Sequence, residues 1–143
     1  MTTVATPVIS GVSASAITGA GATITWTTDQ TASSQIDYGL TTAYGATTTL
    51  DPSLVTAHSQ TLAGLAPGTV YHYRVQSTNA VGLTATSADA TFTTVATPVI
   101  SGVSASAITG SGATIAWTTD QTASSQIDYG LTTTYGATTT LDP

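Results

Sequence analysis

An internal repeat is the feature that most restricts how this chain can fold. Residues 2–52 recur as residues 93–143, an offset of 91, and all but three of the 51 positions are identical. The differences are Ala20 to Ser111, Thr25 to Ala116 and Ala43 to Thr134. Residues 53–92 occur once. A repeat of this length is typical of one small β-domain, so the chain holds one full unit and the first half of another.

Alternating apolar and polar residues predict β-strands in both units. Residues 22–27 place an apolar side chain at every second position with threonine between, and residues 34–39 and 70–77 alternate in the same way. Charged residues make up only 6% of the chain, and the β-branched threonines favour strands over helices. The predicted strands of the full unit are residues 7–17, 22–27, 34–39, 46–50, 59–65, 70–77 and 84–93.

This spacing predicts an all-β fold. We expect a seven-stranded antiparallel β-sandwich over residues 1–92, followed by a partial second sandwich over residues 93–143 that repeats only the first four strands. The inward-facing positions give the predicted core: Ile24, Trp26, Ile36, Tyr38, Leu65, Tyr71, Tyr73, Val75 and Phe92.

Several residues together resemble the fibronectin type III family. They are Trp26, the run Leu-Ala-Pro-Gly-Thr-Val-Tyr-His-Tyr-Arg-Val over residues 65–75, Asn79 and Gly82. The resemblance covers the full unit and part of the second. It implies that Tyr71 forms a corner hydrogen bond between neighbouring strands and that Trp26 fills the core. It also implies two facing sheets, with strands 7–17, 22–27 and 59–65 opposite strands 34–39, 70–77 and 84–93.

Two segments, Thr-Trp-Thr-Thr-Asp over residues 25–29 and Ser-Gln-Ile-Asp-Tyr-Gly over residues 34–39, are similar to the bacterial branch of that family. Members of this branch are spacers beside catalytic domains or repeats in surface-protein arrays. The resemblance therefore implies a non-catalytic spacer module whose natural parent is extracellular or on the cell surface.

Charge and hydropathy exclude several partners. The net charge is -6 and Arg74 is the single basic side chain, so no basic patch can neutralise phosphates. We expect no nucleic-acid binding. No apolar run approaches the roughly 18 residues of a spanning helix, and no signal peptide opens the chain, so we expect a soluble chain without membrane insertion. Cysteine is absent.

Residues that could support catalysis or metal binding are few. His58 and His72 are the only imidazoles, and the alternation predicts that His72 points to solvent. Asp29 and its repeat Asp120 each provide one carboxylate in a loop, too few for a calcium site. We predict no enzyme activity, no catalytic residue, no metal ligand and no cofactor. The alternative function is a protein- or carbohydrate-binding module that uses two loops, with contact residues Asp29, Gln30, Asn79 and Val81.

The half copy is the anomaly in the sequence. Alone, it would expose the apolar side chains Ile115, Trp117, Ile127 and Tyr129, each worth about 1.5–3 kcal/mol if buried. We therefore expect this face to drive self-association or domain swapping, which makes a second copy of the chain the expected partner. A near-identical duplication fits either recent repeat expansion or deliberate engineering.

Overall fold

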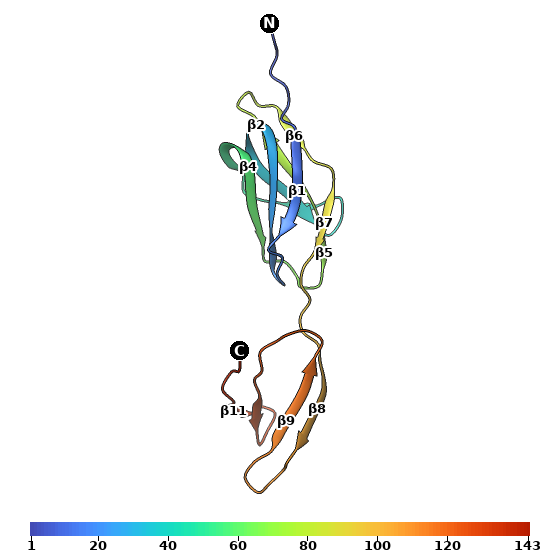
Figure 1. Cartoon of the computed structure of the whole chain (residues 1–143), viewed down its shortest axis with the longest axis vertical. Helices are drawn as coiled ribbons and strands as arrows, with labels where there is room; N and C mark the ends of the chain where they lie inside the picture. Colours follow the sequence, from blue (N-terminus) through green and yellow to red (C-terminus); the bar gives the residue numbers. More distant parts are fainter. The chain divides into compact units, whose positions relative to one another are not determined.

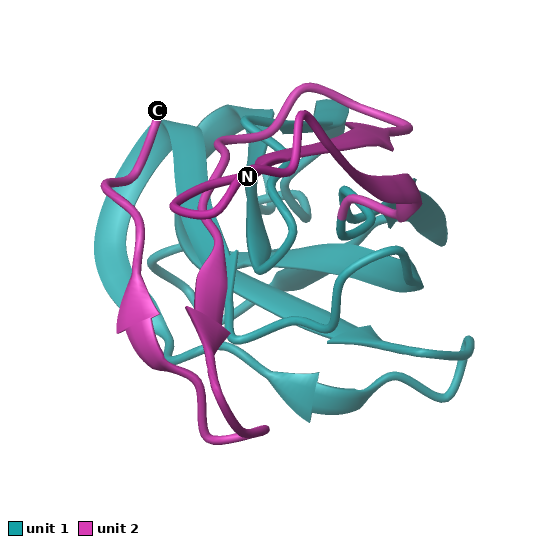
Figure 2. Cartoon of the chain, turned by 90° about the horizontal axis from the view of Figure 1, so that it is seen from below, with its two compact units in different colours: residues 1–97 teal, residues 98–143 magenta.

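A computed structural model describes residues 1–143 as eleven β-strands in two compact units, Met1–Thr97 and Pro98–Pro143 (Figure 2). The chain has no helix long and apolar enough to cross a membrane. Each unit corresponds to one of the two copies in the sequence, with the division falling a few residues after the predicted boundary at residue 93.

The first unit contains seven strands joined into one curled antiparallel sheet (Figure 1). They are β1 (Ile9–Ser15), β2 (Gly21–Gly39), β3 (Gly45–Thr47), β4 (Asp51–Ala63), β5 (Val70–Thr78), β6 (Thr84–Thr86) and β7 (Ala90–Thr93).

Strand β2 connects the two layers of the sandwich. Its first part lies between β1 and β4 and pairs with both (Figure 1). Its second part pairs with β3 and β5. The sequence predicted two strands here, residues 22–27 and 34–39, separated by a loop. The prediction of a loop was wrong, because the whole segment is one strand. The segment stays extended because Ala32 bridges to Val55 on one side and to Asn79 on the other, with a register irregularity between Thr27 and Ala32. Such bulges let a strand bend from one layer into the next.

Two further strand boundaries differ from prediction. Strand β4 begins at Asp51, eight residues before the predicted strand, because its first part pairs with the bent segment of β2. The predicted strand over residues 84–93 is divided into β6 and β7. At the break, the Ser87 hydroxyl accepts a hydrogen bond from the Val75 amide at 3.0 Å, and this side chain replaces a backbone partner.

The core of the first unit lies between the two layers. Of the predicted core residues, those that are buried are Ile24, Trp26, Ile36, Leu65, Tyr73, Val75 and Phe92. Tyr38 and Tyr71 are half-buried and pack against this core. Ala22 and Leu62 complete it, and neither was in the predicted set. The Trp26 indole donates a hydrogen bond to the buried Ser77 hydroxyl at 2.9 Å.

The second unit forms two separate hairpins from nearly the same sequence. Strands β8 (Ile100–Ser106) and β9 (Thr114–Thr119) make one, and β10 (Asp128–Gly130) and β11 (Gly136–Thr138) make the other. The counterpart of β2 is interrupted between β9 and β10, where the first unit holds β2 extended between β4 and β5. The long strand therefore depends on partners that lie outside the repeated sequence.

Candidate functional site

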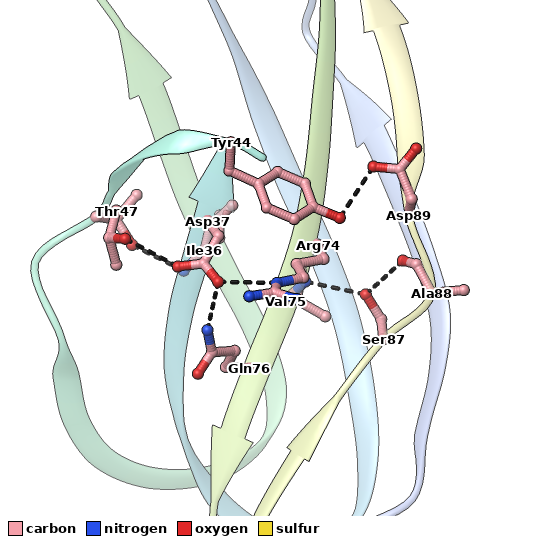
Figure 3. A network of polar contacts seen from close by, with 11 residues as sticks. Ile36, Asp37, Tyr44, Thr47, Arg74, Val75, Gln76, Ser87, Ala88 and Asp89 are labelled. Atoms are coloured by element: carbon pink, nitrogen blue, oxygen red, sulfur yellow. Dashed lines mark hydrogen bonds and ion pairs between the residues drawn. The ribbon is translucent and has the colours of Figure 1, made fainter. Parts of the chain in front are cut away.

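A cluster of polar and charged side chains lies on the outer face of the layer formed by β2, β3 and β5 (Figure 3). At its centre the Asp37 carboxylate accepts hydrogen bonds from Arg74 Nε at 2.9 Å, from Thr47 at 2.8 Å and from Gln76. The Asp37 side chain is only 10% exposed, so it needs these donors to remain charged.

The second half of the cluster is built around Asp89, just before β7. Its carboxylate accepts a hydrogen bond from the Tyr44 hydroxyl at 3.0 Å and pairs with His72 Nδ1 at 2.8 Å. The Arg74 guanidinium lies over the Tyr44 ring, 4.7 Å from its centroid, and joins the two halves. His72, predicted to point to solvent, is thus half-buried and paired with a carboxylate from a neighbouring segment.

The left-handed backbone of Tyr44 belongs to its turn and is no sign of a binding site. Tyr44 has a φ of 61°, and Tyr135 in the second unit, whose residues 98–143 include no arginine, has a φ of 57°. In both copies the tyrosine amide donates to the carbonyl three residues earlier at 2.9 Å. The local turn alone sets this conformation.

Hydrogen bonding controls the ionisation of the cluster. Burial acts to raise the pKa of Asp37, but the hydrogen bonds from Arg74, Thr47 and Gln76 outweigh it and the pKa lies below its usual value. The hydrogen bond from His72 lowers the pKa of Asp89. Burial and the contact with Asp89 raise the pKa of Tyr44. Both carboxylates are therefore stabilised as anions, which makes them poor proton acceptors, and the cluster is suited to holding strands together.

Three of the four residues predicted as loop contacts, Asp29, Gln30 and Asn79, hold the N-terminal segment to the domain. The Asp29 carboxylate accepts a hydrogen bond from the Val8 amide at 2.7 Å. The Gln30 amide donates to the carbonyl of Ala5 at 3.0 Å, and its oxygen accepts from Asn79.

Asn79 itself is buried, and its oxygen accepts from the amides of Val81 and Leu83. Val81 is 60% exposed at the tip of its loop. Among the four predicted contact residues, Val81 alone presents a large apolar side chain to the surface.

His58, considered above as a possible catalytic or metal-binding imidazole, has an environment that the sequence did not predict. It is 3% exposed, and its ring stacks on Trp26 with centroids 5.0 Å apart. Nε2 lies 2.8 Å from the Thr28 hydroxyl and Nδ1 lies 2.8 Å from the Ser34 hydroxyl. The available signal was its position in an alternating strand, four residues before Leu62 and so on the same face.

The apolar face of the second unit is partly open. Ile115, Trp117 and Ile127 are half-buried, and Tyr129 is 55% exposed. Two hollows open on this unit, one of about 280 Å³ beside Trp117 and one of about 500 Å³ beside Ile115, Ile127 and Tyr129.

No group of three or more His, Cys, Asp or Glu side chains is placed to hold a metal ion.

The Tyr71 hydroxyl accepts a hydrogen bond from the Ala66 amide at 3.0 Å, the corner contact that the family resemblance implies.

An antiparallel β-sandwich in which one strand continues from one layer into the other, with a tyrosine hydroxyl bonded to the backbone at the corner between two strands, defines a module of the immunoglobulin-like class. The fibronectin type III domain family matches residues 7–93, and the chain belongs to this family.

Two known proteins are similar to this chain, one over most of its length and one over about two thirds of it. Endoglucanase B from Cellulomonas fimi is 37% identical over 138 residues, which is 90% of this chain and 13% of the endoglucanase. The chain thus spans about an eighth of that relative. The sensor domain of the anti-sigma factor RsgI4 from Pseudobacteroides cellulosolvens is 22% identical, with a TM-score of 0.49, over 66% of this chain and all of that domain.

Proposed function

We propose that the chain is a non-catalytic spacer from a tandem array of fibronectin type III domains in a secreted or cell-surface protein. The observation that carries the proposal is the 91-residue repeat of a family domain, because tandem copies are how such modules extend a chain. The similarity to a small part of an endoglucanase is consistent with a module that accompanies other domains. The paired charges of the Asp37 cluster suit a domain that resists unfolding.

A binding screen with the whole chain tests the spacer role. Immobilised protein is exposed to cellulose, xylan, chitin and a glycan array at physiological salt. If the chain is a spacer, it retains none of these polysaccharides above the level retained by a control surface that carries no protein. Saturable retention of one polysaccharide contradicts the spacer role and supports the alternative.

The alternative is a protein- or glycan-binding module that uses the loops around Asp29 and Asn79. It is favoured by the 60% exposure of Val81, since exposed apolar loop tips are frequent contact points. In that case Val81→Ser abolishes retention, whereas Val70→Ser, at an exposed position on β5, leaves it unchanged.

We further propose that the second unit causes self-association. Its support is the set of exposed apolar side chains, which are Val99, Ile100, Val103, Ile108, Tyr129, Leu131, Tyr135 and Leu141. Light scattering over a concentration series compares the whole chain with a variant that ends at Thr97, the last residue of the first unit. The whole chain should increase in mass with concentration while the variant stays monomeric. Equal monomer masses contradict self-association.

A further inference from the structure

We infer that the surface formed by Asp29, Gln30 and Asn79 is a receptor for the segment that joins one copy of the repeat to the next, so that this segment is held at both of its ends. The inference rests on the proposed spacer function and deepens it, because it names what binds at the loop surface that a binding module would offer to a ligand.

The joining segment is present twice in the chain. Its sequence is Thr-Val-Ala-Thr-Pro-Val, found at residues 3–8, where the chain enters the first unit, and again at residues 94–99, where the chain leaves that unit. The segment lies outside every strand, since β1 begins at Ile9, β7 ends at Thr93 and β8 begins at Ile100. One sequence is therefore seen both as an incoming and as an outgoing segment.

The incoming segment is bound through its backbone by all three receptor residues. The Ala5 carbonyl accepts hydrogen bonds from the Gln30 side chain at 3.0 Å and from the Asn79 side chain at 3.1 Å, which together can occupy both of its lone pairs. The Asp29 carboxylate accepts from the Val8 amide at 2.7 Å, and the Asp29 amide donates to the Val8 carbonyl at 3.2 Å. A short segment without secondary structure is thus fixed at two points.

The receptor side chains are oriented by contacts that do not involve the segment. The Asn79 side-chain oxygen accepts from the amides of Val81 and Leu83, which directs its NH2 group towards the segment. The same NH2 group donates to the Gln30 side-chain oxygen at 3.1 Å, which leaves the Gln30 NH2 group for Ala5. Groups already held in their binding geometry lose little conformational entropy on binding. The three residues therefore form a preformed site.

The outgoing segment is held by a different set of residues. The Thr94 amide donates to the Thr69 carbonyl at 3.0 Å, and the Thr94 hydroxyl accepts from the Thr69 amide at 2.9 Å. The Val95 amide donates to the Thr18 carbonyl at 3.0 Å, and the Val95 carbonyl accepts from the Gly68 amide at 3.1 Å. Thr94 is only 2% exposed. The first two residues of the segment are therefore fixed to the copy that they leave.

The two sets of contacts use different residues of the segment. The outgoing contacts use its first two residues, seen at Thr94 and Val95, and the incoming contacts use its third and sixth, seen at Ala5 and Val8. No backbone group is needed by both sets, so one segment between two copies can make all of these contacts.

The second unit repeats the incoming contact at the sixth residue. Asp120, the repeat of Asp29, accepts a hydrogen bond from the Val99 amide at 2.8 Å, and the Asp120 amide donates to the Val99 carbonyl at 3.3 Å. Flexible linkers, by contrast, are free chains whose ends move independently. A joint of this kind fixes the connecting backbone and leaves the receptor residues unavailable to a separate ligand.

The test is ¹⁵N relaxation of the whole chain, which measures backbone order residue by residue. We expect order parameters of about 0.85, typical of rigid backbone, for the amides of residues 5–8 and 94–99. A flexible linker would give values below about 0.6. Such low values at residues 5–8 overturn the receptor, and such low values at residues 96–99 overturn the joint that is held at both ends.

Variants of the receptor separate segment binding from the general stability of the fold. Asp29→Ala removes the acceptor of the Val8 amide and should raise the hydrogen-exchange rate of that amide about tenfold or more. Asp29→Asn keeps an oxygen acceptor and should retain most of the protection. Neither variant should change exchange of the Val95 amide, which is bonded to the Thr18 carbonyl. Equal exchange of the Val8 amide in the unaltered chain and both variants overturns the assignment.

The duplicated aspartate provides a matched control. Asp120→Ala should raise exchange of the Val99 amide and leave that of the Val8 amide unchanged, while Asp29→Ala should do the reverse. If Asp120→Ala leaves exchange of the Val99 amide unchanged, the incoming contact does not hold the segment in the second copy and the inference is wrong.

The outcome is separable from that of the polysaccharide screen. A chain that retains no polysaccharide but has mobile segments is a spacer with flexible joints, and only the inference about the receptor fails. A chain that retains a polysaccharide while residues 5–8 and 94–99 stay ordered has the fixed joint, and only the spacer role fails.

Discussion

At the scale of single residues, the hydrogen bonds around His58 define its protonation state. The Thr28 hydroxyl donates to the Gln30 carbonyl, so it accepts from His58 Nε2, and the Ser34 hydroxyl then donates to Nδ1. This arrangement requires the neutral ring. Burial lowers the pKa of His58, and the opposing attraction of Asp51 does not reverse this. The ring therefore belongs to the packed core in its uncharged form.

The first prediction is a loss of stability in mild acid that depends on His58. The unfolded histidine titrates near pH 6.5 and the folded one lower, so the contribution is complete above about pH 6.5 and is lost as the pH falls towards the folded pKa. Urea unfolding should show a slope of at most about 1.4 kcal/mol per pH unit in this window. His58→Gln should flatten the slope between pH 5 and 6.5, and an unchanged slope in this variant contradicts the assignment.

The second prediction concerns the Asp37 cluster. Arg74→Met should lower the free energy of unfolding by about 1–2 kcal/mol, because the Arg74 side chain is 41% exposed and solvent screens part of the interaction. Thr47 and Gln76 still donate to Asp37 in this variant.

A double-mutant cycle with Asp37→Asn, read from urea unfolding, isolates the coupling. A coupling energy indistinguishable from zero would mean that the ion pair does not stabilise the domain. The lowered pKa of Asp37 also makes the free energy of unfolding fall in acid. The contribution of Asp37 to stability is present above about pH 4 and is lost as the pH falls through the pKa of the folded state.

At the scale of elements, β2 and its repeat are nearly one sequence in two conformations. In the first unit Gly21–Gly39 is one strand, and in the second the counterpart is divided into β9 and β10. The short hairpin that follows is the same in both units. Gly39 lies close to the backbone carbonyl of Tyr44, and Gly130 lies close to that of Tyr135. Local turns thus form identically, whereas the long strand needs β4 and β5.

The third prediction uses this duplicated hairpin. A Cβ at Gly39 would lie 1.5 Å from the Tyr44 carbonyl oxygen, and a Cβ at Gly130 would lie 1.6 Å from that of Tyr135. Gly39→Ala should therefore destabilise the first unit by about 3 kcal/mol or more, measured by thermal unfolding. Gly130→Ala creates the same clash in the second unit and is the matched control. Equal effects of both variants on the main transition would contradict the separation of the units.

At the scale of the whole molecule, the two units differ in how completely they bury their apolar residues. The first buries Ile24 and Trp26 to within 1% of full burial, while the repeats Ile115 and Trp117 remain half-buried. Hydrophobic burial is the dominant favourable contribution to folding. The cooperative unfolding of this chain should therefore belong to the first unit.

The fourth prediction follows from this difference. A variant that ends at Thr97 should keep the midpoint and enthalpy of the main calorimetric transition of the whole chain, because the core cluster lies entirely within the first unit. Trp26→Phe should lower that midpoint, and Trp117→Phe should not. A shift of several degrees on removal of residues 98–143 would show that the second unit stabilises the first.

By itself, the sequence determined the all-β class, the repeat, the family and most of the core. Alternation selects Ile24, Trp26 and Val75 as inward residues because a pleated strand turns every second side chain to the same face. The turn at Tyr44, which recurs at Tyr135, follows from the same local chemistry. These features depend on neighbours in the chain, and neighbours can be read directly.

Only the tertiary structure decided which segments became one strand and how the polar residues are used. The extension of β2 through Ala32, the burial of His58 against Trp26 and the pairing of His72 with Asp89 all depend on partners distant in sequence. The half copy makes the reason plain. Nearly the same residues form an interrupted strand with an open face where β4 and β5 are missing, because a strand is stabilised by what pairs with it and covers it.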